Sequence, residues 1–394
     1  MNIQLFHGLK AEKISSGMEH CFFGYYDIPA FSKDGKYHLC NKVNFYDKIP
    51  EKDDIMEIGI INISTKEYTK ISETTAWNFQ QGCMLQWRGP AFTNEVIYNI
   101  CIDGEYYGVI HNIKTNERKI LPAPAANVSS DGIKALSINF PRLFGFRPGY
   151  GYAGYEDKFS NQNIPENDGV YLMDLDTLEN KLVINYKQLW DIVGKAFDYN
   201  KDTKLVINHI TFNTDATRIV FLVRYFPNTG HMRNTTVLTA DIEGENIFKL
   251  IDFLYASHYH WKDAGSILFH SCYKGKKSLY EYLDRTDKVR AIGMGQFNHD
   301  GHCNYSPDRK WILYDSYPDS KWWSRLYLYN FTKNKKYEIA RIKSEERIYK
   351  TSVDIRCDLH PRWSPDGKAI SFDSLHEGRR DIYYIDLTKF IKNI

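Results

Sequence analysis

The chain of 394 residues has almost no excess charge and no long apolar run. Its 51 Lys and Arg residues nearly balance its 49 Asp and Glu residues, for a formal net charge of +2. A balanced composition gives no sign of binding to a polyanion, so we expect no nucleic-acid partner. No stretch approaches the roughly 18 apolar residues that a membrane helix requires, and the first residues contain no apolar core of a signal peptide. We therefore expect no membrane span and no secretion signal.

Cysteine is also scarce. The seven cysteines are scattered, odd in number and without a C-x-x-C pair. Such a set is typical of reduced thiols in a cytoplasm, most of them small buried side chains. The sequence thus predicts a cytoplasmic protein without a disulfide framework.

A short turn-and-strand pattern recurs along the chain. Its clearest copy is WSPDGKAISFDS, in which Pro365 and Gly367 suit a tight turn and the residues after it alternate between polar and apolar. Seven passages fit this pattern, the second of them degenerate: residues 31–40, 86–99, 128–137, 212–222, 260–270, 305–316 and 363–374.

Most copies precede a second strand that ends in another turn. Seven such units at regular spacing are the signature of an all-β, seven-bladed β-propeller with four-stranded blades. We predict one such domain over residues 1–394, and an irregular pair of β-sandwiches is the alternative. Residues 1–14 are expected to supply an outer strand to the last blade.

Two insertions interrupt the repeats. Residues 140–168 show no strand period, and long loops of this kind are usually functional or flexible. We expect this segment to cover one face of the ring, with Arg142 and Arg147 able to meet an anionic ligand. Residues 187–199 have apolar side chains at helical spacing and predict at most one short inserted helix.

Aromatic residues and amides gather in two segments of the N-terminal half. The segments HCFFGYYD and WNFQQGCMLQW precede repeat strands and contain His20, Tyr26, Asp27 and Gln81. Ring faces and neutral amides suit sugars, so we expect these residues to bind substrate. The alternative for any of the amides is the satisfaction of buried backbone groups.

Four histidines lie in register with the repeats of the second half. His209, His258, His302 and His360 each precede a repeat turn, and Asp358 accompanies the last of them. This position begins the innermost strand of a blade, which lines the channel of a propeller. Quasi-symmetry is therefore expected to gather these side chains around the axis.

Histidines that fall outside this register, among them His270 and His376, are expected in loops or at the surface.

This combination of residues predicts a particular chemistry. Neutral imidazoles with a carboxylate suit a divalent transition metal, and a histidine without metal can act as a general base. Arg224 and Arg233 follow the His209 strand and can hold a carboxylate with two parallel hydrogen bonds. A cation, an arginine and a base together permit abstraction of a proton next to a carboxylate, as in β-elimination from uronates.

At these residues the sequence resembles a known family. Residues 205–388 are similar to the oligogalacturonate lyases, cytoplasmic seven-bladed propellers with TolB-type repeats. The shared features, in order along the chain, are His209, Arg233, the S-H-x-x-W motif that begins at Ser257, His302, and the H-P-x-W-S-P motif that begins at His360.

The resemblance implies that His258 is the base, that Arg233 and His209 belong to the catalytic centre, and that a manganese ion is bound. His302 and His360 match two of the metal ligands of the family. Asp358 stands where the family has a third histidine, and the position of its glutamine falls near Ile355.

Because the N-terminal half shares only the repeat with that family, we expect a divergent sister with its own acidic oligosaccharide substrate. Two other functions stay open. One is a glycan hydrolase or transferase that uses carboxylates such as Asp27, Asp315 or Asp358. The other is a non-catalytic propeller that binds a glycan or a protein. Metal content and the effect of removing the His258 imidazole discriminate between these functions, while the oligomeric state is left open.

Overall fold

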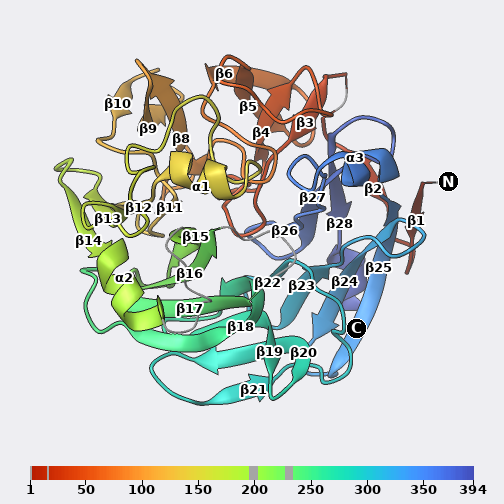
Figure 1. The fold of residues 1–394 in the computed structure, drawn as a ribbon. Coiled ribbons are helices and arrows are strands. Elements are labelled where there is room, and N and C mark those ends of the chain that lie inside the picture. The colour runs from red at the N-terminus through yellow and green to blue at the C-terminus, as the bar shows by residue number, and fades with distance from the viewer. Residues whose placement is uncertain (1, 16, 195–202, 227–233) are drawn as a thin grey trace.

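In the computed structural model, residues 2–15, 17–194, 203–226 and 234–394 are described. Antiparallel β-sheets dominate this part of the chain and are arranged around a common centre, with a few short helices between them (Figure 1). The predicted all-β class is confirmed. Among the helices described, none has the length and apolar character that a membrane crossing requires.

Four sheets have four strands each. The first three follow one another along the chain, and the fourth combines the last three strands with one from the N-terminus. Their strands are β3 (His20–Phe22), β4 (Tyr37–Val43), β5 (Met56–Asn62) and β6 (Tyr68–Thr74); β7 (Gln86–Trp87), β8 (Glu95–Ile102), β9 (Glu105–Asn112) and β10 (Arg118–Ile120); β11 (Asn127–Val128), β12 (Lys134–Ser137), β13 (Gly169–Asp174) and β14 (Asn180–Asn185); and β26 (Arg362–Trp363), β27 (Ala369–Ser374), β28 (Asp381–Asp386) and β2 (Ala11–Lys13).

Two larger sheets complete the arrangement. A five-stranded sheet contains β22 (Cys303–Tyr305), β23 (Trp311–Asp315), β24 (Trp323–Asn330), β25 (Lys335–Lys343) and β1 (Ile3–Leu5). A seven-stranded sheet contains β15 (Lys204–Phe212), β16 (Arg218–Phe226), β17 (Asn234–Asp241), β18 (Phe248–Trp261), β19 (Ser266–Tyr273), β20 (Lys276–Leu283) and β21 (Val289–Ala291). The first part of the long strand β18 pairs with β17 and its last part pairs with β19.

The N-terminal strands join sheets that are built by the end of the chain. Strand β2 pairs with β28, with Ala11 opposite Ile385. This confirms the outer strand expected from residues 1–14. Strand β1 pairs with β25, a second pairing that the sequence did not indicate. In Figure 1 the red N-terminal segment accordingly lies beside the blue strands.

The aspartates of the repeat turns are structural, as their sequence pattern indicates. In the best preserved turns the serine hydroxyl donates to the aspartate two residues later, as Ser306 does to Asp308 and Ser364 to Asp366 at 2.7 Å. The same carboxylates accept from a backbone N–H two residues further on. This is an Asx-type turn, which fixes the local backbone and leaves these carboxylates no catalytic role.

The prediction of at most one short helix is wrong. The structure has α1 (Phe140–Phe146), α2 (Tyr186–Val193), α3 (Glu346–Thr351) and α4 (Thr388–Lys392). Helix α1 lies inside the predicted loop, where Asn139 caps its first turn and Pro141 fits the N-terminal position. Helix α2 confirms the start of the predicted helix, whereas residues 195–199 of that prediction lie outside the described residues. Helices of five to eight residues are too short for a clear period in the sequence.

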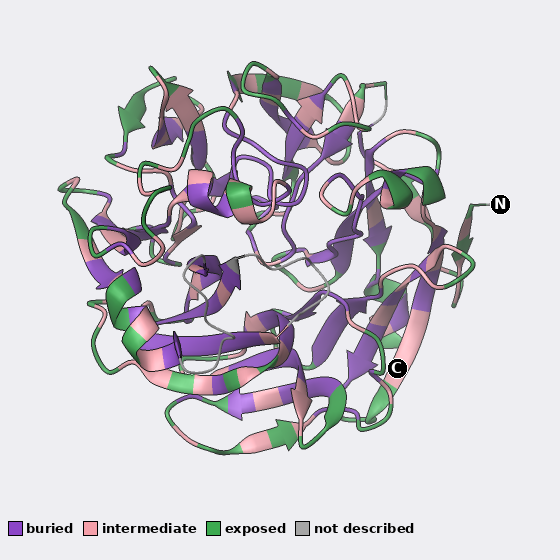
Figure 2. Cartoon of the chain, viewed as in Figure 1, coloured by how far each residue is buried: buried purple, intermediate pink, exposed green. Residues whose placement is uncertain are grey.

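Burial increases towards the centre of the ring. Figure 2 shows buried residues along the sheets and around the centre, with exposed residues on the outer strands and loops. Strand β10, an outer strand, is exposed throughout, while every residue of β22 is buried. The inner ends of the sheets therefore hold side chains in a dry, fixed environment.

Candidate functional site

Two β-bulges direct histidines into the centre. The register between β15 and β16 shifts at His209, and the register between β18 and β19 shifts across Ser257 and His258. A bulge adds a residue to one strand and re-aims its side chain. His209 and His360 also have left-handed backbones, with φ of 51° and 40°. Non-glycine residues rarely adopt this conformation, and it is concentrated at functional sites.

The four in-register histidines meet, as the sequence predicts. The ring centroids of His258 and His302 are 4.1 Å apart, and those of His302 and His360 are 4.2 Å apart. His209 joins them through Tyr25, whose ring stacks on His209 at 4.9 Å and lies 5.2 Å from His360. All four imidazoles are buried.

Two of these histidines and Asp358 form a candidate metal centre. One ligand atom from each of His302, Asp358 and His360 lies within 4.8 Å of the others. Nε2 of His302 is 3.1 Å from Nε2 of His360. Two ligands bound to one ion at about 2.0–2.2 Å are themselves about 3 Å apart, so this spacing fits a shared ion.

Asp315 sets the tautomer of His302. Its carboxylate accepts from Nδ1 of His302 at 2.9 Å and from the backbone N–H of the same residue at 2.6 Å. With its proton on Nδ1, neutral His302 presents the lone pair of Nε2 to His360. His360 can meet this lone pair by donating a proton from its own Nε2, and a metal ion bound by both nitrogens would take the place of that proton. A carboxylate behind a ligand histidine is also the usual support of a metal site.

The carboxylate of Asp358 has its own partners. Nε of Arg356 donates to both oxygens, at 2.9 and 2.7 Å, and the hydroxyl of Tyr349 donates to Oδ1 at 3.1 Å. Each carboxylate oxygen has two lone pairs, so a ligand position is still available. The side chain of Ile355, near which the resemblance places the family's glutamine, is apolar and buried and offers no ligand atom.

Burial and neighbouring charges separate the pKa values of these imidazoles. Burial, together with the charge of His302, lowers the pKa of His258 to about 4. Burial also holds the pKa values of His209 and His360 well below the usual range. His302 is the exception, because the charges of Asp315, Asp358 and Asp300 outweigh its burial and raise its pKa. The carboxylates therefore favour a cation at this point of the cluster.

His258 is held by a carboxylate that sequence reasoning missed. Asp300 Oδ1 lies 3.1 Å from Nδ1 of His258 and 3.2 Å from Nδ1 of His270. On its other side, Nε2 of His258 lies 3.4 Å from the hydroxyl of Tyr317. His270 is thus buried beside the cluster, and the expectation of a loop or surface position is wrong because its strand, β19, lies inside the sheet. His376 lies in the turn after β27, which confirms the expected loop position, but it is buried there and its Nδ1 bonds the hydroxyl of Ser374.

Two arginines lie beside His209 at one end of the cluster. The charges of Arg224 and Arg147 both lower the pKa of His209, so both guanidinium groups lie near that ring. Arg147 stacks over Tyr150 at 4.8 Å and donates through Nε to Asp354 at 3.1 Å. Its Nη2 is buried without a hydrogen bond in the described part of the chain. Arg233, the third expected arginine, lies outside the described residues.

Two expected substrate-binding residues have other roles. Arg142 donates to the backbone oxygens of Leu205 and Asn163 and to the carboxylate of Asp157, at 2.7 to 3.0 Å. It is fully buried and ties the inserted segment of residues 140–168 to β15, so the expectation that it meets a ligand is not supported. His20 lies on β3 against the ring of Tyr46, away from the histidine cluster.

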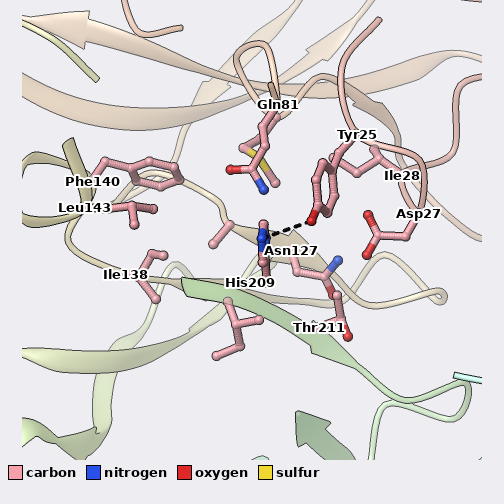
Figure 3. Close-up of a pocket in the computed structure, with 13 residues that line it drawn as sticks. Tyr25, Asp27, Ile28, Gln81, Asn127, Ile138, Phe140, Leu143, His209 and Thr211 are labelled. Carbon is pink, nitrogen blue, oxygen red and sulfur yellow. Dashed lines mark hydrogen bonds between the residues drawn. The ribbon is translucent and has the colours of Figure 1, made fainter. Parts of the chain in front are cut away.

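The other expected residues do border the centre. Tyr26 lies 5.0 Å from the ring of His302 and is fixed by hydrogen bonds to the backbone of Tyr259. Asp27 and Gln81 line a cavity of about 20 Å³ together with Tyr25 and His209 (Figure 3). That volume has room for about one water molecule. Burial raises the pKa of Asp27 to about 7.

The chain was compared with known proteins. No family model matches its sequence, and no curated protein matches it either. Similar solved structures include an oligogalacturonate lyase in complex with manganese, with a TM-score of 0.70, 16% identity, and coverage of 99% of this chain and 96% of that one. An oligogalacturonate lyase from Vibrio parahaemolyticus has a TM-score of 0.66 and 14% identity, with 98% and 96% of the two chains covered.

The β-propeller domain of the trilobed protease from Pyrococcus furiosus has a TM-score of 0.50 and 12% identity, with 92% and 95% covered. At these identities the likeness concerns the fold. This chain is a β-propeller, and the resemblance to oligogalacturonate lyases stated from the sequence is confirmed at the level of the fold.

Proposed function

We propose that this protein is a metal-dependent lyase that cleaves a uronate-containing oligosaccharide by β-elimination. The observation that carries the proposal is the convergence of His302, His360 and Asp358, as a ligand set, with His258 beside them. Arg147 and Arg224 lie at the same centre and supply positive charge for a substrate carboxylate. An acidic oligosaccharide is therefore the proposed substrate.

The residues divide the work of such a reaction. When bound, a divalent ion supplies a Lewis acid that stabilises negative charge on a carboxylate. Asp300 holds the proton of His258 on Nδ1, so Nε2 carries the lone pair of a general base. The arginines favour the enediolate, whose charge exceeds that of the bound carboxylate. Burial keeps His258 neutral at ordinary pH, which is the state that accepts a proton.

Manganese is the proposed metal. Two imidazoles and a carboxylate are a nitrogen and oxygen donor set, which suits manganese, iron, nickel or zinc. Among these, manganese is supported by the similar lyase solved with that ion. Asp358 in place of a histidine adds a negative charge, and Arg356 offsets part of it.

Metal content and product formation test the proposal together. Wild type, His302→Ala and the exposed control His7→Ala would be incubated with Mn²⁺, dialysed and analysed for bound metal. Wild type and control should keep close to one ion per chain and release unsaturated uronate from acidic oligosaccharides, and His302→Ala should do neither. Absence of metal from the wild type would refute the proposed mechanism.

A carboxylate-based hydrolase or transferase is the second candidate. Asp27, with a pKa near 7, has the property of a general acid. Of the other two carboxylates considered for that chemistry, Asp315 is bound to His302 and Asp358 is bound to Arg356. We therefore rank this function below the lyase.

We further propose seven blades and a cytoplasmic location. Dividing the seven-stranded sheet at β18 gives two four-stranded units, and the other five sheets then bring the total to seven. The location is supported by the seven cysteines, all of which are free thiols.

A further inference from the structure

Tyr317 is a residue of the histidine centre to which the sequence assigned no role. It follows β23 and is half-buried, while the imidazole beside it is buried. Its hydroxyl lies 3.4 Å from Nε2 of His258 and accepts from Nη2 of Arg356 at 3.1 Å. The guanidinium of Arg356 also lies 5.0 Å from the centre of the phenol ring.

These contacts form one continuous chain of hydrogen bonds. Asp300 accepts from Nδ1 of His258, Nε2 of His258 accepts from Tyr317, and Tyr317 accepts from Arg356, which in turn holds Asp358. The lone pair of the base and the hydroxyl proton of the phenol therefore lie side by side. Arg356 is placed to stabilise a phenolate if the proton leaves.

We infer that Tyr317 is the proton donor to the leaving oxygen, and that the substrate is a uronate whose C5 hydrogen and C4 oxygen lie on the same face of the sugar ring. The inference rests on the proposed lyase function. It names an acid that the elimination requires and narrows the class of sugar.

His258 and Tyr317 together account for every proton that moves in the reaction. Nε2 of His258 takes the C5 proton, and the electrons of that bond pass into the carboxylate as an enediolate. They return to form the double bond between C4 and C5 while the bond between C4 and oxygen breaks. The leaving oxygen takes the hydroxyl proton of Tyr317, and the phenolate then recovers a proton from the imidazolium 3.4 Å away. Nothing is oxidised, and both residues end in their starting state.

The short distance between the two groups decides the stereochemistry. Groups that act on opposite faces of a sugar must be far apart, as the separation of roughly 6.5–9.5 Å between the carboxylates of inverting glycosidases illustrates. At 3.4 Å, His258 and Tyr317 leave no room for a ring between them and must approach the same face. In glucuronates and mannuronates in their usual chair the C5 hydrogen and the C4 oxygen are syn, whereas in galacturonates they are anti. The geometry therefore favours a glucuronate or mannuronate substrate.

Two assays with the full-length, Mn²⁺-treated protein test this inference. In the first, wild type is offered 4-linked tetraglucuronate and tetragalacturonate, and release of unsaturated uronate is measured. In the second, Tyr317→Phe and the control Tyr329→Phe, whose lost hydroxyl bonds Asn334 in another part of the sheet, are given tetraglucuronate and methyl 4-deoxy-4-fluoroglucuronide. Fluoride leaves without a proton, so its release does not need the acid.

We expect elimination from tetraglucuronate at least tenfold faster than from tetragalacturonate. The rate of elimination from tetraglucuronate should be about 10²-fold lower, or more, in Tyr317→Phe than in the control. Its rate of fluoride release should stay within about threefold of the control. Preference for tetragalacturonate, or an equal loss on both leaving groups, would overturn the inference and leave the lyase function standing. Failure of wild type to eliminate from any of the three compounds, and from 4-linked tetramannuronate, would overturn both. The first assay uses wild type alone and does not depend on the folding of a variant.

Discussion

The carboxylate of Asp315 lies 2.9 Å from Nδ1 of His302, on the side of the imidazole that faces away from His360. This contact fixes which nitrogen of His302 faces the candidate metal position. Asp315 itself makes no contact with the candidate metal position, so we expect it to act on metal binding through His302.

Replacing this carboxylate should weaken metal binding. Asp315→Asn keeps the shape of the side chain but removes its charge, so we expect the affinity for Mn²⁺ to fall 10- to 100-fold. Titration calorimetry with Mn²⁺ would measure the change, with Asp319→Asn, in a loop ion pair with Arg325, as control. Equal affinities of wild type and Asp315→Asn would contradict a supporting role for this carboxylate.

Removing the imidazole of His258 should stop the reaction but leave the metal in place. His258→Ala removes the proposed base without touching His302 Nε2, His360 or Asp358. We expect kcat to fall by about 10²–10⁴, with bound metal close to wild type. Joint loss of metal and activity would assign His258 to the metal centre instead.

Replacing either of two arginines in the segment of residues 140–168 should have different effects on substrate binding and on stability. Arg147 has a buried Nη2 that makes no hydrogen bond within the described residues, so Arg147→Ala should mainly raise KM for an acidic substrate, by about tenfold. Arg142 is buried with Asp157 and two backbone oxygens, so Arg142→Ala should lower the free energy of unfolding by about 3–5 kcal/mol. Urea unfolding and initial rates would separate the two effects. A large loss of stability in Arg147→Ala with unchanged KM would show that it is structural as well.

A buried histidine outside the site should make stability dependent on pH. Nδ1 of His38 lies 2.6 Å from the backbone oxygen of Leu39 and Nε2 lies 2.8 Å from the hydroxyl of Ser371, which links β4 to β27. Burial, aided by the charge of Arg362, lowers its pKa to about 3. The unfolded chain, with a histidine pKa near 6.5, binds the proton first. The contribution of neutral His38 is therefore complete above pH 6.5 and is lost as pH falls towards 3.

Between pH 6.5 and pH 4 this loss amounts to about 3 kcal/mol. His38→Gln cannot titrate, so it should be less stable than wild type at pH 7.5, and the difference should shrink steadily down to pH 4. Urea unfolding across this range would measure both curves. Parallel curves would show that His38 does not titrate on unfolding.

The features that could be predicted from the sequence are those that repeat. The repeated turns and strands predicted the propeller. Because a closed ring brings equivalent positions together, the shared register also predicted that four histidines meet, namely His209, His258, His302 and His360. The outer strand formed by residues 11–13 followed from the same counting of strands.

The features that escaped prediction depend on single contacts. Asp300 and Tyr317 lie in irregular segments between strands, and no period places them beside His258. Asp315 ends strand β23, but its distance from His302 depends on the turn between β22 and β23. Arg142 has the charge and shape of an anion-binding residue. Only its contacts in the structure show that its hydrogen bonds stabilise the fold instead.

The pairing of β2 with β28 has a consequence for how the chain is made. Ala11 can meet Ile385 only after the 374 residues that follow Ala11 up to that position have been synthesised. Until then the sheet formed by β26, β27 and β28 lacks its outer strand β2, and the backbone groups of β2 cannot pair with β28. Contacts between such distant positions slow folding, because the entropic cost of closing the loop comes before the contact stabilises the chain. This sheet of the ring is therefore completed only after β28 has been synthesised, and the histidine centre likewise has to wait for His360.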